Sequence, residues 1–271
     1  MDRRTLLQIG AGCGIGAISG ATGIWVGGHY KPELRRIYDG VFRPERLPHN
    51  EDDHRADFDK TAQVITRKQR SQTKETVEAL KKKYEGEVLG KFRVWDLIQK
   101  LALCVDPTDT TLLCTSQYMH VCQIIASMEE EGELDDDMLL TALLHDLGKV
   151  AMLAGEPPEH VVCFVEPVEA LEPGGGLDKV IFQFGHDEIA YSRFKDHVPE
   201  HISWMIRYHS TVIGKSEPFM SGRDREYEAK YLSTFRKHDQ GSKSPRFIPT
   251  HFTLDRYRDF IESRFPNPIL F

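Results

Sequence analysis

Apolar residues recur at intervals of three and four positions in almost every segment after residue 58, and this pattern limits the possible folds more than any other feature. Such spacing places apolar side chains on one face of an α-helix. No run of alternating apolar and polar residues is of comparable strength, so we expect an all-α helical bundle. The segments with helical periodicity are TAQVITRKQRSQTKETVEALKKKY, RVWDLIQKLALCV, TSQYMHVCQIIASMEEE, DDDMLLTALLHDLGKVAML, DKVIFQFGHDEIAYSRFKD, PEHISWMIRYHS, EYEAKYLSTFRKHD and LDRYRDFIESRF.

Composition divides the chain into parts. Residues 31–58 contain three prolines and the charged stretch EDDHR without sustained apolar periodicity, which is typical of a linker. Residues 59–271 would then form a single catalytic domain. With 40% hydrophobic and 28% charged residues, the chain can bury a sizeable core. Inside this domain, residues 154–178 are rich in proline and glycine, and we expect a loop there.

The first part, residues 1–30, is a separate apolar segment. Residues 6–28 carry no charged side chain and are long enough to span a bilayer. If they form an anchor, the basic residues that follow outnumber Arg3 and Arg4 before it, so the positive-inside rule places the large domain in the cytoplasm. Arg3-Arg4 followed by Thr-Leu-Leu also resembles a twin-arginine export signal. A tail without contact to a membrane is the third interpretation.

Charge and cysteine content narrow the function classes. The formal net charge is −7 and no basic stripe is present, which argues against nucleic acid as the main partner and favours a small molecule. The five cysteines form no C-x-x-C pair. They therefore indicate neither a disulfide framework nor a thiolate zinc site, and a reducing compartment is the simpler interpretation.

A candidate metal site begins at the adjacent His145 and Asp146. In a helix over 138–153, Asp146 falls on the stripe of Leu139, Leu143 and Val150 and so faces the core. A buried carboxylate is costly unless a cation or hydrogen bonds compensate it. Adjacent residues lie about 100° apart around a helix, so His145 and Asp146 could serve one metal or two neighbouring ones.

Other core-facing histidines and one aspartate accompany this pair. Helical spacing turns His209 and Asp239 inward, His120 lies in a largely apolar segment, and His186 follows two phenylalanines with the same ambiguity. Each of the histidines alone is more often a hydrogen-bonded core residue. As a set they offer only nitrogen and oxygen ligands, which suit iron, manganese or zinc, and two carboxylates allow one to bridge two metals. Lys149, one turn beyond His145, would project over the same site or else meet carbonyls at a helix end. The inward residues are His120, His186, His209 and Asp239. Asp106 and Ser210 are candidate polar contacts for a ligand, and each one alone is more often a turn or cap residue.

The order of these residues along the chain resembles a known family. His120 is followed by HDLGK, GHDE, MIRYHS and a distant aspartate in FRKHDQGSK. This pattern, together with QTKETVEALKKKY, VWDLIQKLALCVDPTD and SGRD, is similar to myo-inositol oxygenase from about Gln72 to the end of the chain. The resemblance implies an HD-type helical domain with a mixed-valent di-iron centre. It also implies cleavage of the myo-inositol ring to D-glucuronate with dioxygen, a reaction of inositol catabolism in the cytoplasm.

Residue roles follow from the same resemblance. Iron ligands would be His120, His145, Asp146, His186, His209 and Asp239, with Asp146 bridging the two ions. Substrate contacts would be Asp106, Lys149, Ser210 and Lys243, with Lys149 also catalytic. Asp187 and His238 have no ligand role in the family pattern.

Two departures from the family keep alternatives open. The connection from Leu153 to Gly185 is much shorter than in the animal and plant enzymes, where it helps to cover and bind inositol, and the apolar segment 1–30 has no counterpart in the soluble members. A di-iron oxygenase acting on another hydroxylated or phosphonate substrate is therefore an alternative. HD-type domains also include metal-dependent phosphohydrolases, which would release phosphate from nucleotides without oxygen. A non-catalytic binding protein would hold no metal at these positions.

Overall fold

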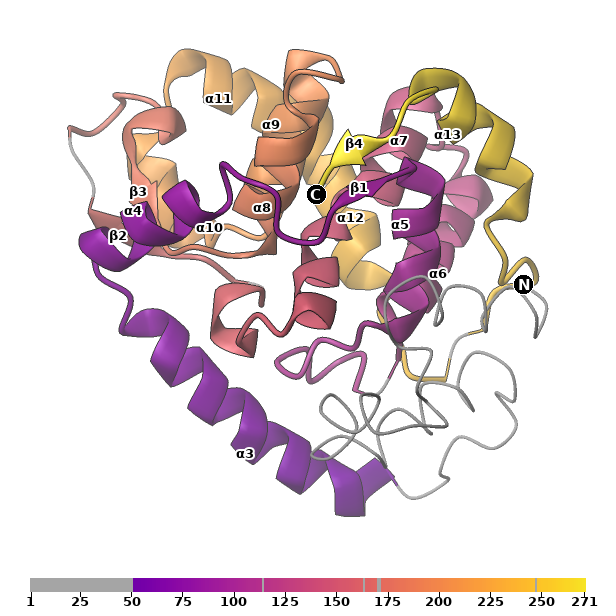
Figure 1. Cartoon of the computed structure of the whole chain (residues 1–271), viewed down its shortest axis with the longest axis horizontal. Helices are drawn as coiled ribbons and strands as arrows, with labels where there is room; N and C mark the ends of the chain where they lie inside the picture. The colour runs from indigo at the N-terminus through magenta and orange to yellow at the C-terminus, as the bar shows by residue number, and fades with distance from the viewer. Residues whose placement is uncertain (1–50, 114, 163, 170–171, 247) are drawn as a thin grey trace.

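The computed structural model describes residues 51–113, 115–162, 164–169, 172–246 and 248–271, and in these ranges the fold is mostly helical, as predicted (Figure 1). The α-helices are α3 (Glu51–Arg70), α4 (Lys74–Lys83), α5 (Val94–Lys100), α6 (Gln117–Glu131), α7 (Asp136–Leu144), α8 (His186–Phe194), α9 (Glu200–Tyr208), α10 (Ile213–Ser216), α11 (Gly222–Tyr227), α12 (Ser233–Gly241) and α13 (Arg258–Arg264). Short 3-10 segments are η2 (Leu101–Leu103), η3 (Leu147–Ala154), η4 (Pro158–His160), η5 (Leu177–Lys179), η6 (Glu217–Phe219) and η8 (Asp255–Tyr257). A π-helical segment, η7 (Glu228–Leu232), joins α11 to α12.

The helices begin where polar side chains satisfy their first backbone N–H groups. Ser116 accepts a hydrogen bond from the Met119 N–H at the start of α6, and Asp135 accepts one from Met138 before α7. Thr73 caps α4 in the same way, so the single helix predicted over residues 61–84 is in fact two helices.

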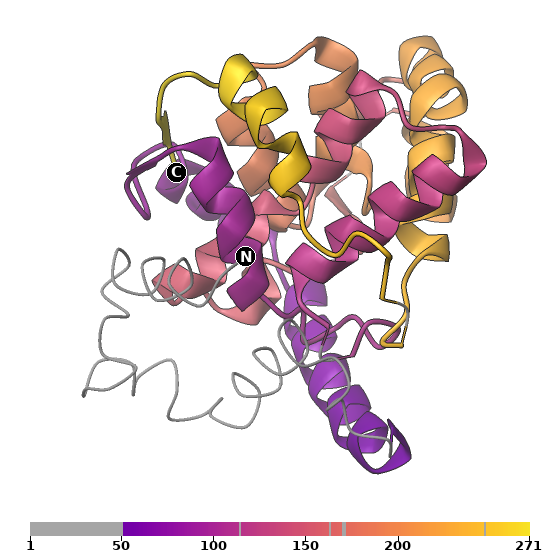
Figure 2. The same cartoon turned by 90° about the vertical axis from the view of Figure 1, so that its right-hand side faces the viewer.

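Helix α3 runs across residue 59, where the domain was predicted to begin. α3 begins at Glu51, so residues 51–58 of the predicted linker are helical. α3 projects from the rest of the bundle (Figure 2) and meets it near η4. The apolar segment over residues 1–30 and its interpretation as an anchor or signal lie outside the described residues. Among the helices that are described, none combines the length and apolar character needed to cross a bilayer.

Two small antiparallel sheets depart from the all-helical expectation. β1 (Lys91–Phe92) pairs with β4 (Ile269–Leu270), which ties the end of the chain to the connection between α4 and α5. β2 (Pro167–Glu169) pairs with β3 (Ile181–Phe182). The second sheet lies partly in the predicted loop and replaces the first turns of the helix predicted over residues 178–196, so α8 starts only at His186.

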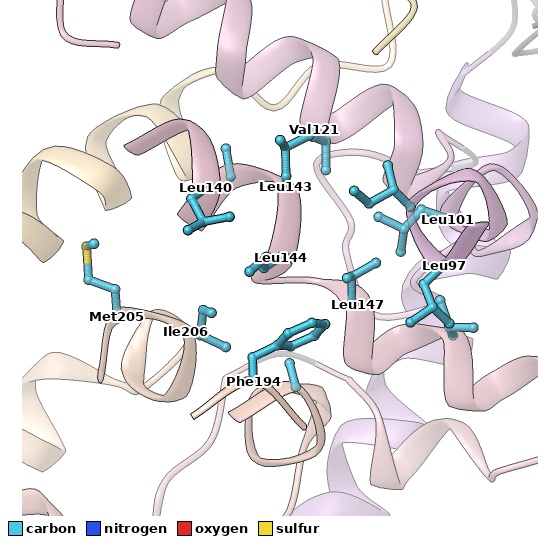
Figure 3. Packing of buried hydrophobic residues seen from close by; sticks show 14 of the residues in the cluster. Leu97, Leu101, Val121, Leu140, Leu143, Leu144, Leu147, Phe194, Met205 and Ile206 are labelled. Carbon is cyan, nitrogen blue, oxygen red and sulfur yellow. The ribbon is translucent and has the colours of Figure 1, made fainter. Parts of the chain in front are cut away.

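The core surrounds the short stretch that leads from α7 into η3. Leu144 and Leu147 are fully buried there, between Leu97 of α5 on one side and Ile206 of α9 and Phe194 of α8 on the other (Figure 3). Burial of one such leucine side chain contributes roughly 1.5–3 kcal/mol. The core therefore fixes the residues between Leu144 and Leu147, which are His145 and Asp146.

Candidate metal centre

The six predicted ligand residues come from five separate parts of the chain and meet in the interior. All are almost completely buried, and most of them stand where a helix begins or ends. His120 lies in the first turns of α6, His145 and Asp146 between α7 and η3, His186 at the start of α8, His209 directly after α9, and Asp239 in the last turn of α12.

Asp146 is shared by two groups of ligand atoms. In one group, the ligand atoms of His120, His145 and Asp146 lie within 4.8 Å of one another, and in the other those of Asp146, His186 and His209 do. The Asp146 Oδ2 atom is 3.3 Å from the His145 Nε2 atom, whereas Oδ1 is 3.1 Å from the His186 Nε2 atom. One carboxylate oxygen thus faces each group, as a carboxylate that bridges two cations requires.

Asp239 extends the first of these groups. Its Oδ1 atom lies 2.8 Å from the His120 Nε2 atom. We therefore call His120, His145, Asp146 and Asp239 the first group, and Asp146, His186 and His209 the second group.

The chain turns at the His145–Asp146 pair, which corrects the prediction of one continuous helix over residues 138–153. α7 ends at Leu144, and Asp146 has φ −95° and ψ 3°, outside the ideal helix, before η3 starts at Leu147. The prediction that Asp146 faces the interior is right, since its side chain is 2% exposed. The turn leaves the Ala142 carbonyl available to the His145 ring, whose Nδ1 atom lies 2.9 Å away.

Backbone carbonyls fix three of the imidazole rings. The Nδ1 atoms of His145, His186 and His209 lie 2.9, 3.3 and 2.8 Å from the carbonyl oxygens of Ala142, Val162 and Ile206. A carbonyl can only accept, so Nδ1 carries the proton and Nε2 of the neutral ring presents a lone pair to the centre. Histidine ligands of metals are usually held in this way.

The orientation of these lone pairs fits a cation. Among the described residues, the buried Nε2 atom of His145 has no hydrogen-bond partner. The Nε2 atoms of His186 and His209 lie only 3.0 Å apart. Two lone pairs at that separation repel each other unless a proton or a metal ion lies between them, and the donor set of nitrogen and carboxylate oxygen suits iron, manganese or zinc.

The pKa shifts of both carboxylates and of His209 favour metal binding. Burial raises the pKa of Asp146, but the charges of His145 and Lys149 outweigh burial and hold this pKa well below its usual range. Burial likewise opposes ionisation of Asp239, and Lys243 and His120 lower its pKa well below the usual range. For His209, burial and the neighbouring His145 and His186 lower the pKa. Ionised carboxylates and a neutral His209 are ligand forms. Burial opposes ionisation of His145, but the Asp146 carboxylate outweighs burial and raises the pKa of this imidazole, so a metal ion at His145 competes with a proton.

Lys149 contacts the shared carboxylate. Its Nζ atom lies 3.1 Å from the Asp146 Oδ1 atom, 3.2 Å from the Asp106 Oδ2 atom and 3.0 Å from the Gln117 Oε1 atom. Its side chain is 2% exposed. Lys149 thus meets two carboxylates and an amide oxygen rather than only helix-end carbonyls. Gln117 was missed in the sequence because a polar residue in the first turn of a helix carries no distinctive signal.

Unlike Lys149, which lies in η3, the predicted substrate contacts Asp106, Ser210 and Lys243 lie in connections between helices. The Asp106 Oδ1 atom accepts the Thr108 N–H at 2.8 Å, so Asp106 holds its own loop and Lys149 at once. In the same loop, the Asp109 Oδ2 atom lies 2.9 Å from the Lys243 Nζ atom. Asp109 is a second residue that the sequence did not single out.

Ser210, the remaining predicted substrate contact, directly follows His209 in the chain. Its hydroxyl donates to the carboxylate of Asp187, so it faces a neighbouring acid. Asp187 is buried, and burial raises its pKa.

Gly148 and Phe235 also shape the centre. A Cβ atom on Gly148 would lie 1.9 Å from the His186 carbonyl oxygen, so only glycine allows η3 and α8 to come this close. This glycine stands inside the HDLGK stretch and could have been noticed there. The Phe235 ring packs edge-on against the His145 ring, with centroids 5.2 Å apart.

Known proteins match the chain over most of its length. The model of a family described as "Myo-inositol oxygenase" matches residues 58–170 and 162–271. "Probable inositol oxygenase" of Oryza sativa subsp. japonica is 28% identical over 235 residues, which cover 72% of this chain and 76% of that protein. "Inositol oxygenase 1" of Arabidopsis thaliana is 27% identical over 237 residues (73% and 76%), and "Inositol oxygenase" of Homo sapiens 26% over 247 residues (75% and 85%).

Proposed function

The chain belongs to the myo-inositol oxygenase family, and from this premise we propose that it uses dioxygen to cleave the ring of myo-inositol to D-glucuronate at a di-iron centre. One observation carries the proposal. Asp146 presents its two carboxylate oxygens to two separate groups of buried histidines. A hydrogen-bonded core would not need the Nε2 atoms of His186 and His209 to face each other at 3.0 Å beside a shared carboxylate, whereas a pair of cations accounts for this arrangement.

The two groups define the proposed ligand sets. His120, His145, Asp146 and Asp239 would hold one iron, and Asp146, His186 and His209 the other. Bound there, the irons would supply Lewis-acid contacts for substrate hydroxyls and would pass electrons from the substrate to dioxygen, so that the overall reaction needs no external reductant. The surrounding residues favour the ionised forms of Asp146 and Asp239 and the neutral form of His209, which are the forms that would bind cations, whereas His145 would give up a proton to a metal ion.

The surrounding polar residues would bind the polyol. Myo-inositol is uncharged and carries a hydroxyl on every ring carbon, so its site needs both donors and acceptors. Lys149 supplies ammonium donors next to the shared carboxylate, and Asp106 supplies an acceptor 3.2 Å from that ammonium. Lys243 and Ser210 would add further contacts. Lys149 is the proposed catalytic residue because its Nζ atom can hold or donate a proton directly beside the Asp146 carboxylate.

An oxygen-uptake assay tests the proposal. The full chain is loaded with iron under anaerobic conditions and then given myo-inositol and oxygen. We expect oxygen consumption together with the formation of D-glucuronate. Oxygen uptake with another polyol or a phosphonate, but not with inositol, would contradict the substrate. Release of phosphate from nucleotides in the absence of oxygen would contradict the reaction type.

A further inference from the structure

Arg236 is not one of the six proposed ligands, but it links α12, the helix that carries Asp239, to the backbone of His209. It lies on α12, three residues before Asp239, so both side chains leave the same side of the helix. Its guanidinium reaches the end of α9: Nε donates to the His209 carbonyl at 2.9 Å, and Nη2 donates to the Tyr208 carbonyl at 2.6 Å and to the Thr211 hydroxyl at 2.9 Å. Arg236 therefore holds the backbone that carries the His209 ring.

The position of His209 depends strongly on that backbone. Because His209 follows directly after the last residue of α9, its carbonyl is one of the helix-end groups that lack an intrahelical partner. Within its own helix, the ring is fixed by the Nδ1 contact to Ile206. Without the guanidinium, the end of α9 would keep that local contact but lose its link to α12.

The Nη1 end of the Arg236 guanidinium is held by Glu228. Its Nη1 atom contacts both carboxylate oxygens of Glu228, at 2.8 and 3.0 Å, and the Arg236 side chain is 11% exposed. Glu228 begins the π-helical segment η7, and π-helical turns occur frequently at functional sites. A bidentate pair of this kind restricts the direction of the guanidinium.

We propose that Arg236 is a positioning residue that sets the second metal position by holding His209 in register with α12. The inference rests on the proposed two-metal centre. The same helix then contributes Asp239 directly to the first group and controls the second group through Arg236. Loss of Arg236 should weaken the second group far more than the first.

The chain provides a matched control in Arg207. Arg207 lies on α9 itself, and its Nε and Nη2 atoms contact both oxygens of Glu188 at 2.8 and 3.1 Å, with 16% of the side chain exposed. It resembles Arg236 in burial and in its carboxylate partner, but its guanidinium pairs with Glu188 and not with His209. A purely structural effect of losing a buried arginine would therefore be similar in both variants.

The experiment measures metal binding rather than turnover. Full-length apoprotein, Arg236→Met, Arg236→Lys and Arg207→Met are titrated anaerobically with Fe²⁺ by calorimetry, and their metal content is measured after desalting. We expect two equivalents for the unmodified chain and for Arg207→Met. We expect about one retained equivalent for Arg236→Met, with the second bound on the order of 10-fold to 100-fold more weakly. Arg236→Lys, which can keep one of the backbone contacts, should fall between the two.

Several results would overturn the inference. Two equivalents at unchanged affinity in both Arg236 variants would show that His209 does not depend on Arg236. An equal loss in Arg207→Met would show that any buried arginine has the same effect. Fewer than two equivalents in the unmodified chain would overturn the two-metal centre itself, and is distinguished from the other failures because it precedes any substitution.

Discussion

The Nζ atom of Lys149 lies 3.1 Å from the Oδ1 atom of Asp146, the carboxylate that both ligand groups share. Both side chains are buried. Lys149 also contacts Asp106, which we propose to bind the substrate, so this ion pair links a proposed substrate contact to the metal centre. The ammonium group of Lys149 can therefore act directly on a molecule that binds between Asp146 and Asp106.

Replacement of Lys149 should lower catalytic activity without loss of bound metal. We expect Lys149→Met to keep both metal equivalents, because no ligand is removed, and to lower kcat/KM by about 10²–10⁴-fold, the usual contribution of a residue that transfers or donates a proton. Lys100→Met is the control, since Lys100 is also buried but lies over the Phe92 ring, 5.0 Å from its centroid. Loss of iron from Lys149→Met would show that the lysine acts on the metal site instead.

Asp146 and Asp239 should differ in how many metals depend on them. Asp146→Asn removes the anion that both groups share, so we expect both equivalents to be lost. Asp239→Asn affects only the first group, and we expect about one equivalent to remain. Metal content after anaerobic loading and desalting measures both variants. Equal losses in the two would contradict the shared role of Asp146.

Gly148 should tolerate no larger side chain. In Gly148→Ala the new methyl would overlap the His186 carbonyl, which a Cβ would approach to 1.9 Å. Either η3 or the start of α8 must move, at a cost of about 1–3 kcal/mol in the free energy of unfolding, and the second group should lose metal affinity. At Gly214 a Cβ would meet nothing within 4 Å, so Gly214→Ala should be neutral or slightly stabilising. Urea denaturation of the two apo variants distinguishes them.

Glu156 should contribute stability that disappears in acid. Burial opposes its ionisation, but His160, Lys83 and Tyr84 contact its carboxylate and lower its pKa to about 2. A carboxyl group with a lowered pKa in the folded state stabilises above its unfolded pKa of about 4.3 and loses this effect as the pH falls through the folded value.

The pH dependence of the free energy of unfolding separates the contribution of the Glu156 charge from that of its packing. At pH 7, Glu156→Gln should lower the free energy of unfolding of the apoprotein by on the order of 2 kcal/mol, allowing for partial screening. The difference from the unmodified chain should shrink as the pH falls from about 4 to about 2. A difference that is independent of pH would mean that the charge of Glu156 contributes little.

Local patterns along the chain were enough to predict where most helices form and that several site residues face inward. α6 and α9 were predicted within one or two residues, because apolar spacing depends on the geometry of a single helix. The same spacing predicted the burial of Asp146, His209 and Asp239, and the family resemblance added His120, His145 and His186.

The tertiary structure alone decided how these residues meet. The end of α7 at Leu144, the carbonyls that orient three imidazoles, and the contacts of Gln117 and Arg236 were not predicted. Gln117 meets Lys149 across 32 positions, and Arg236 meets His209 across 27. Periodicity is a local property of the backbone, whereas a contact between two helices depends on how the whole core packs, and no local pattern records that.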